Sequence, residues 1–280
     1  MSLLRVFTAL SVILATAGCM PPKSRLDVAG LQGLRASTGW GAAPQATVSY
    51  LRSAGAADVQ VVWVHGTPGE AQGWSDYVLE PVPGTVSVAL DRPGFGHSTP
   101  EGPVTSLESQ AAAVVALFPP PPQRVVVVGH SLGGAVAAMV AARNPQRVRA
   151  LVLLAASLDP AQEAIHPMQY VARTWPVASL LPRALRNANE ELMVLKSELL
   201  ALQALLPLVT APTIIVHGTR DDLVPFANVA YMQSHLQGSS CVKTVVLDGQ
   251  NHFLPWNSET TVREAVAWAV TQGTPESAPC

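Results

Sequence analysis

The stretch Val125-Val-Val-Val-Gly129-His130-Ser131-Leu132-Gly133-Gly134 decides how the rest of this 280-residue chain is interpreted. Its four consecutive β-branched residues predict a short strand buried on both faces. Residues 135–143 are rich in alanine and free of proline, which predicts a helix directly afterwards. The pentapeptide between them therefore lies at a sharp strand-to-helix turn, the setting in which G-x-S-x-G carries a nucleophilic serine.

Ser131 is the candidate nucleophile. A serine hydroxyl is a weak nucleophile until a neighbouring base takes its proton, and a tight turn lifts its oxygen clear of the backbone. Gly129 and Gly133 lack the Cβ atoms that would block such a turn. The amide of Leu132 lies at the opening of the predicted helix, where a developing oxyanion would be stabilised. A glycine-rich turn with a buried serine is the alternative, which the flanking strand and helix disfavour.

With this motif in that setting, the chain resembles the α/β-hydrolases from about residue 48 to about residue 271. Members of this family have an α/β fold, a mostly parallel eight-stranded sheet flanked by helices, with the nucleophile elbow after the fifth strand. The resemblance implies the same fold here, with a small helical lid after the sixth strand. Residues 157–188 break the rhythm of strands and helices with Pro160, Pro167, Pro176 and Pro182, and they are the expected lid.

The resemblance also implies an oxyanion-binding loop after the third strand. A predicted strand over residues 58–64 runs into His65-Gly66-Thr67-Pro68-Gly69. In the family the amide of the residue after His-Gly faces the substrate, so the amides of Thr67 and Leu132 are the expected oxyanion donors. His65 itself is expected to be structural. A plain turn rich in glycine and proline is the alternative for this loop.

The acid of a catalytic triad is expected after the strand predicted over residues 212–216. His217-Gly218-Thr-Arg-Asp221-Asp222 follows it. The family's usual spacing from that glycine, and from Pro225, selects Asp221 over Asp222. A carboxylate at this place holds the tautomer of the catalytic imidazole. Asp159, just after the sixth predicted strand, is the alternative acid, because some members of the family place it there.

The base is expected on the loop after the last predicted strand, residues 242–247. His252 lies on that loop and matches the position of the family's catalytic histidine. An isolated loop histidine is more often a bystander. The order Ser131, Asp221, His252 nevertheless reproduces the family's order of nucleophile, acid and base, each after a predicted strand.

Composition excludes several other classes. The formal net charge is −2, which provides no basic surface for nucleic acid. No run reaches the ~20 apolar residues of a membrane span. No cluster of histidine, cysteine and carboxylate side chains has metal-ligand spacing, so no metal site is expected. Acyl transfer by a serine, histidine and aspartate requires no organic cofactor, and none is expected.

The N-terminus predicts export. Arg5 precedes an apolar run over residues 6–17 of secretory length. Ala17-Gly18-Cys19 then resembles the cleavage box of bacterial lipoproteins, which implies a lipidated (palmitate-type) Cys19 and a membrane-anchored protein at the periplasmic face or cell surface. An ordinary signal peptide and a secreted protein are the alternative.

The expected organisation is a signal peptide (1–18), a tether (19–46), an α/β-hydrolase domain (47–273) and a tail (274–280). Lipidation of Cys19 would leave Cys241 and Cys280, for which both a disulfide and two free thiols stay open. The sequence does not define the oligomeric state.

The expected function is that of a serine hydrolase that cleaves small apolar carboxylic esters through an acyl-enzyme. Apolar residues of the lid segment are expected to line the acyl site: Ile165, Met168, Tyr170, Val171, Trp175, Val177, Leu180 and Leu181. A serine at the elbow disfavours dehalogenase and epoxide hydrolase chemistry, which uses aspartate there. A prolyl-aminopeptidase-like or other acyl hydrolase is one alternative, although no acidic cluster for an amino terminus is evident. A catalytically silent surface binding module is the other.

Overall fold

The computed structural model describes residues 28–41 and 46–272. It contains an eight-stranded sheet with the order β1-β2-β4-β3-β5-β6-β7-β8. Pairs β1–β2 and β2–β4 are antiparallel, and the other pairs are parallel. The strands are β1 (Arg35–Gly39), β2 (Thr47–Arg52), β3 (Val59–Val64), β4 (Thr85–Leu90), β5 (Val125–His130), β6 (Val148–Leu154), β7 (Thr213–Gly218) and β8 (Val242–Leu247).

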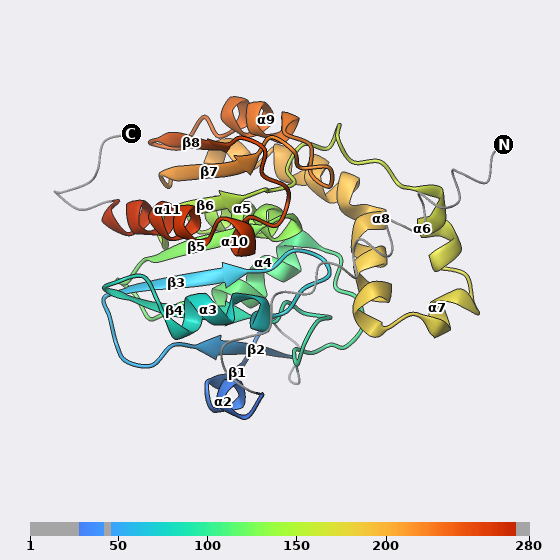
Figure 1. Ribbon diagram of the computed structural model, residues 1–280, viewed down its shortest axis with the longest axis horizontal. Coiled ribbons are helices and arrows are strands. Elements are labelled where there is room, and N and C mark those ends of the chain that lie inside the picture. Colours follow the sequence, from blue (N-terminus) through green and yellow to red (C-terminus); the bar gives the residue numbers. More distant parts are fainter. Residues whose placement is uncertain (1–27, 42–45, 273–280) are drawn as a thin grey trace.

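Helices cover both faces of this sheet (Figure 1). One face packs on α2 (Val28–Gly33), α3 (Ser75–Leu79), α10 (Leu254–Asn257) and α11 (Glu259–Thr271), and the other on α4 (Leu107–Val115), α5 (Leu132–Arg143), α8 (Arg183–Gln203) and α9 (Ala227–His235). Successive residues of β5 alternate between the two cores, Val125 and Val127 facing one and Val126 and Val128 the other. The valine run therefore forms a strand buried on both faces, and the predicted α/β-hydrolase fold is confirmed.

The lid follows β6 and extends beyond one end of the sheet (Figure 1). It comprises α6 (Pro167–Ala172), α7 (Val177–Leu180) and the start of α8. Neither α6 nor α7 buries a residue, whereas α8 buries Leu195, Leu199 and Leu202 against the core. The lid is thus attached to the domain mainly through α8.

Part of the expected tether is folded. Residues 35–39 form β1, which pairs with β2 from Arg35↔Leu51 to Gly39↔Thr47. The sequence of β1 has no β-branched run, so propensity did not indicate a strand. Backbone pairing with β2 and an ion pair of 2.5 Å between Arg35 and the buried Asp91 hold it.

The predictions that concern residues 1–27 and 273–280, including Cys19 and Cys280, lie outside the described residues. Cys241 precedes β8 and is disulfide-bonded. No helix in the described part of the chain is long and apolar enough to cross a bilayer.

Candidate functional site

Ser131 occupies a strained turn between β5 and α5. Its φ and ψ are 57° and −129°, a backbone conformation that residues other than glycine rarely adopt. Its carbonyl accepts from the amides of Gly134 (2.9 Å) and Ser157 (3.2 Å), which hold the turn. A Cβ on Gly133 would lie 2.4 Å from the carbonyl oxygen of His65, so the close approach of the elbow to the oxyanion loop requires glycine there.

Asp221 and His252 are hydrogen-bonded across 31 residues of sequence, with Nδ1 and Oδ2 2.8 Å apart. The other carboxylate oxygen of Asp221 accepts from the amides of Leu223 (3.0 Å) and Val224 (2.7 Å). Burial alone would raise the pKa of Asp221, but the hydrogen bond and charge of His252 and the Val224 amide lower it below its usual value. An ionised Asp221 keeps the proton of His252 on Nδ1 and leaves Nε2 free.

The other two candidate acids lie elsewhere. Asp222 is exposed, although it is adjacent in sequence. Asp159 accepts from the amide of Ala161 (2.9 Å) and the side chain of Gln162 (3.3 Å), and thereby stabilises its own loop. Of the three carboxylates, only Asp221 contacts His252.

The predicted oxyanion donors flank Ser131. Neither the Thr67 amide nor the Leu132 amide donates a hydrogen bond within residues 28–41 and 46–272. A Cβ on Gly66 would lie 2.8 Å from the Cβ of Ser131, so the loop before Thr67 packs directly on the elbow. His65 is buried and neutral, because burial and then the charge of Arg92 hold its pKa well below the usual value. A structural role for His65 agrees with this environment.

A pocket of about 450 Å³ joins these groups. Ser131 and His252 line it together with His65, Gly66 and Thr67. Its apolar walls come from both the domain and α8: Trp74, Leu132, Leu192, Leu195, Leu223, Val224, Phe253 and Trp256. The volume is that of a small-molecule site.

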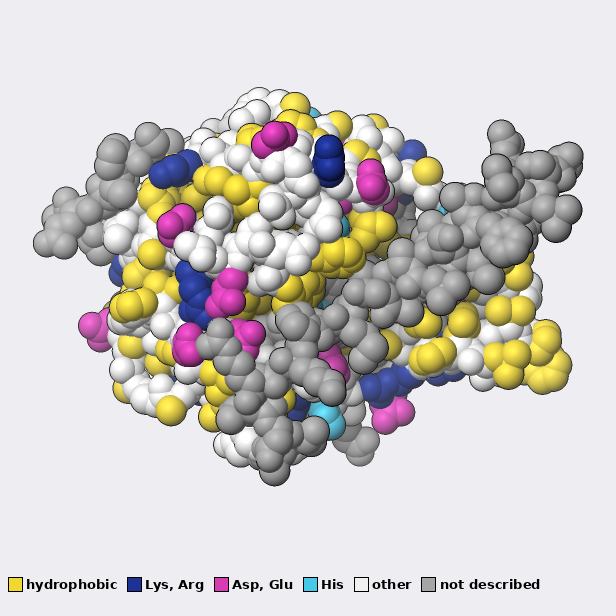
Figure 2. Space-filling model, in the orientation of Figure 1, with side chains coloured by type: hydrophobic (Ala, Val, Ile, Leu, Met, Phe, Trp, Pro, Cys, Tyr) yellow, Lys and Arg dark blue, Asp and Glu magenta, His cyan; other side chains and the backbone are white. Residues whose placement is uncertain are grey.

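The predicted source of the apolar wall is wrong. None of the eight lid residues expected there lines the pocket, and Trp175 and Leu180 are 81% and 82% exposed. Hydrophobic side chains gather instead on the outer end of the lid (Figure 2). The physical reason is that α6 and α7 bury no residue against the domain and contribute none to the pocket, whereas α8 packs on the core and contributes Ala184, Leu192 and Leu195.

Two carboxyl groups line the pocket, Glu70 and Glu163. Burial raises the pKa of each; for Glu163 a hydrogen bond from the hydroxyl of Ser157 partly offsets this effect. Glu163 belongs to the lid segment, and sequence spacing did not indicate that it reaches the elbow. The sequence showed no evident acidic cluster for a substrate amino terminus, and the pocket places these two carboxyl groups near the candidate site.

His130 supports the base from within the nucleophile motif, a role that the sequence analysis missed. Its Nε2–H donates to the backbone carbonyl of His252 across 2.9 Å. Burial, then the neighbouring His252, lowers the pKa of His130 to about 3, so its side chain is neutral at physiological pH.

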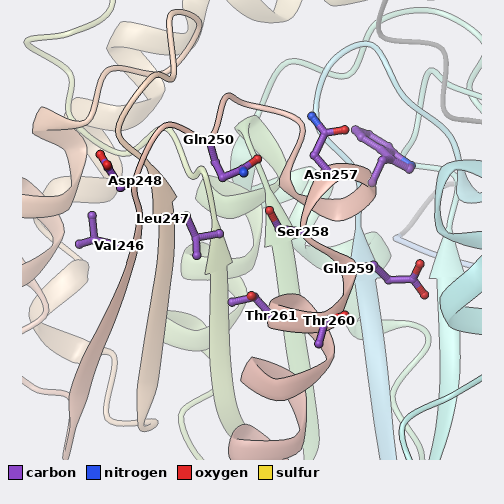
Figure 3. Close-up of a pocket in the computed structure, with 10 residues that line it drawn as sticks. Val246, Leu247, Asp248, Gln250, Asn257, Ser258, Glu259, Thr260 and Thr261 are labelled. Carbon is purple, nitrogen blue, oxygen red and sulfur yellow. The ribbon is translucent and has the colours of Figure 1, made fainter.

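A second hollow lies between the end of β8 and the start of α11 (Figure 3). It is lined mainly by polar side chains, Asp248, Gln250, Asn257, Ser258, Glu259, Thr260 and Thr261 among them. None of the predicted catalytic residues lines it. No three histidine, cysteine or carboxylate side chains of the described residues are arranged to hold a metal ion.

Comparison with known sequences identifies the same fold. The profile of the family described as "alpha/beta hydrolase fold" matches residues 60–177. The chain is 37% identical over 109 residues to the dihydrolipoyllysine-residue acetyltransferase component of the acetoin-cleaving system of Cupriavidus necator, and 29% identical over 182 residues to the serine hydrolase BPHL of Mus musculus. These matches cover 38% and 54% of the chain but only 29% and 59% of the relatives, less than two thirds of either protein's length.

Solved structures are similar over most of the chain. A membrane phospholipase A described as a bacterial virulence factor has a TM-score of 0.62 at 19% identity, with 95% of this chain and 99% of that chain covered. A monoacylglycerol lipase from Paleococcus ferrophilus has a TM-score of 0.66 at 18% identity, with 80% and 98% covered. At such identities the likeness concerns the fold.

Proposed function

We propose that this chain, which belongs to the α/β-hydrolase superfamily, is a serine hydrolase that cleaves carboxylic esters through an acyl-enzyme. The observation that carries the proposal is the 2.8 Å hydrogen bond between Asp221 and His252, in a pocket that the strained Ser131 also lines. The likeness to lipases and to a serine hydrolase supports it.

In the proposed reaction the Oγ of Ser131 attacks the ester carbonyl while Nε2 of His252 takes the hydroxyl proton. The amides of Thr67 and Leu132 stabilise the negative oxygen of the tetrahedral intermediate. Collapse breaks the bond to the alcohol, which leaves with the proton from His252. Water then attacks the acyl-enzyme with His252 as base, and the acid product leaves Ser131 regenerated. Asp221 stays ionised and stabilises the imidazolium in both halves.

The walls of the pocket favour substrates with an apolar acyl or alcohol group. Leu192 and Leu195 of α8 line the pocket together with Trp74 and Trp256 of the domain. Burial of an apolar chain of ~100 Å² against such walls contributes roughly 2.5 kcal/mol. Short to medium chains suit a pocket of about 450 Å³.

A second candidate substrate class carries an amino group. Glu70 and Glu163 line the pocket, and burial disfavours their charged forms. An ammonium group beside either carboxylate would offset that cost, which favours aminoacyl esters or an aminopeptidase-like reaction on the same machinery. The hydrogen-bonded Asp221–His252 pair disfavours a catalytically silent binding protein, because binding alone does not require it.

The test uses protein that lacks residues 1–19. It is labelled with a fluorophosphonate probe and then assayed with p-nitrophenyl esters of increasing chain length and with prolyl and alanyl arylamides. We expect labelling of Ser131 and faster cleavage of the esters. Faster cleavage of the arylamides would establish the aminopeptidase alternative, and failure to label would support a silent binding protein.

Export as a lipoprotein is a further part of the proposal. It depends on Arg5, the apolar run and Ala17-Gly18-Cys19. A lipidated Cys19 would place the esterase at a membrane surface, and an ordinary signal peptide would release it instead.

A further inference from the structure

A buried ion pair connects the lid helix α8 to the loop after β4. Arg92 and Glu191 are 0% and 3% exposed, and two hydrogen bonds join them, Nη1 to Oε1 at 2.6 Å and Nη2 to Oε2 at 3.1 Å. The fork of the guanidinium matches the two oxygens of the carboxylate, an arrangement that fixes orientation as well as distance. Gln110 of α4 adds a hydrogen bond of 2.9 Å to Oε1 of Glu191.

The same two side chains hold the oxyanion loop. The guanidinium of Arg92 donates to the carbonyl oxygens of His65 and Gly66, each at 2.9 Å. Its backbone amide donates to Nε2 of His65 at 2.9 Å. The hydroxyl of Thr67 donates to Oε2 of Glu191 at 2.5 Å. Three consecutive residues of the loop are thus bonded to one ion pair.

The planarity of the peptide bond transmits this hold to the oxyanion site. The Gly66 carbonyl and the Thr67 amide belong to one rigid trans unit, in which they point in opposite directions. Arg92 and Nδ1 of His65 (2.7 Å) both donate to that carbonyl. The direction of the Thr67 N–H is therefore set by Arg92 and His65, which bond to the carbonyl side of the same peptide unit.

We propose that Glu191 is a positioning residue for the oxyanion hole: through Arg92 and the Thr67 hydroxyl it orients the Thr67 amide for catalysis. The inference rests on the proposed esterase function. Because Glu191 lies on α8, whose Leu192 and Leu195 line the acyl pocket, the helix that binds the substrate also sets the donor that stabilises its transition state.

The alternative is that the ion pair only fastens α8 to the domain. Removal of Glu191 would then lower stability without any specific effect on charge stabilisation in the transition state. The two roles are separated by the affinity for an alkylboronic acid, which adds to the serine Oγ and presents a negative tetrahedral centre to the oxyanion donors.

The test compares Glu191→Gln with Glu190→Gln, the adjacent position on α8, whose carboxylate pairs with the half-exposed Arg173 at 3.0 Å. Loss of orientation should cost less than deletion of a donor, so for Glu191→Gln we expect kcat to fall by roughly 10- to 100-fold with KM within about twofold. Boronate affinity should fall by a similar factor. Glu190→Gln should keep the wild-type values.

Thr67→Val provides a second measurement if Glu191→Gln does not fold. It removes only the hydroxyl bonded to Glu191 and leaves the amide and the ion pair in place, and it should lower kcat and boronate affinity together. Wild-type kcat and boronate affinity in both variants would overturn the inference and leave the esterase proposal standing. A wild-type protein that neither cleaves esters nor labels with fluorophosphonate would overturn both.

Discussion

The side chain of His130 donates a hydrogen bond to the backbone carbonyl of His252, with Nε2 and O 2.9 Å apart. The residue before the candidate nucleophile therefore holds the loop of the candidate base. Ser131 and His252 lie after strands β5 and β8, which are not neighbours in the sheet. The hydrogen bond thus provides a direct connection between the two loops that must act together.

This buried histidine predicts a pH dependence of stability. The pKa of His130 is about 3 in the folded protein, against 6.5 for a histidine in a solvated chain, so between these values the unfolded state binds more protons. The unfolding free energy should therefore fall as pH drops below about 6.5, with a contribution from His130 of up to about 1.4 kcal/mol per pH unit. Urea unfolding at pH 7, 6 and 5 should give a shallower slope for His130→Gln than for wild type.

His97→Gln, at an exposed position, is the control for the loss of a histidine. Parallel slopes for wild type and His130→Gln would contradict this prediction. They would show that the pKa of His130 is the same in the folded and unfolded states.

The assignment of the acid predicts unequal effects of two adjacent substitutions. Asp221→Asn should reduce kcat by about four orders of magnitude, because Asp221 orients His252 and stabilises its cation. Asp222→Asn, at the exposed neighbour, should remain within about twofold of wild type, as for most surface substitutions. Steady-state hydrolysis of a p-nitrophenyl ester measures both. The reverse pattern would assign the acid to Asp222, and two mild variants would point to Asp159.

The acyl site is predicted to be formed by α8 and not by the outer lid. Leu192→Trp should narrow the pocket, because tryptophan is larger than leucine. It should lower kcat/KM for longer acyl chains by at least about tenfold relative to acetate, since the loss of room for one or two methylenes in a hydrophobic site has an effect of this size. Leu180→Ser, at a position 82% exposed on α7, is the matched control and should leave the chain-length profile unchanged. A changed profile in Leu180→Ser with an unchanged one in Leu192→Trp would return the acyl site to the outer lid.

Export and the disulfide give linked predictions. If Cys19 is lipidated, its thiol is blocked, and the disulfide partner of Cys241 must be Cys280. Mass spectrometry of the protein from membranes should find a diacylglyceryl Cys19 at the N-terminus. Non-reducing peptide maps should pair Cys241 with Cys280. A free N-terminus at another residue, or a Cys19–Cys241 peptide, would contradict lipidation.

The sequence predicted those parts of the fold that depend on local patterns. The valine run of β5, the strand at residues 242–247 and the elbow lie where the sequence indicated, and the strands predicted over residues 58–64 and 212–216 begin and end within two residues of their observed bounds. The strand Arg35–Gly39 was missed because it forms by pairing with β2 and not by its own propensity.

The site was less accessible to prediction where it depends on distant contacts. The motif-bearing residues Ser131, Asp221 and His252 could be proposed from spacing after strands. Glu191 contacts Arg92, which is 99 residues away in the sequence. The spacing of polar and apolar residues along the chain does not indicate such a long-range contact. The orientation of the lid could not be predicted either, because the apolar residues of a short helix do not indicate which face of that helix covers a pocket.

Detection of the covalent intermediate is the most direct test of the proposed function. Purified protein lacking residues 1–19 is mixed with excess p-nitrophenyl butyrate, quenched in acid within the first turnover, and mapped by peptide mass spectrometry. The proposal predicts a burst of about one equivalent of nitrophenol per enzyme and a butyryl group on Ser131, with neither in Ser131→Ala, whose steady-state rate should be roughly four to six orders of magnitude lower. Turnover without any acyl adduct on Ser131, or with the same rate in Ser131→Ala, would contradict it.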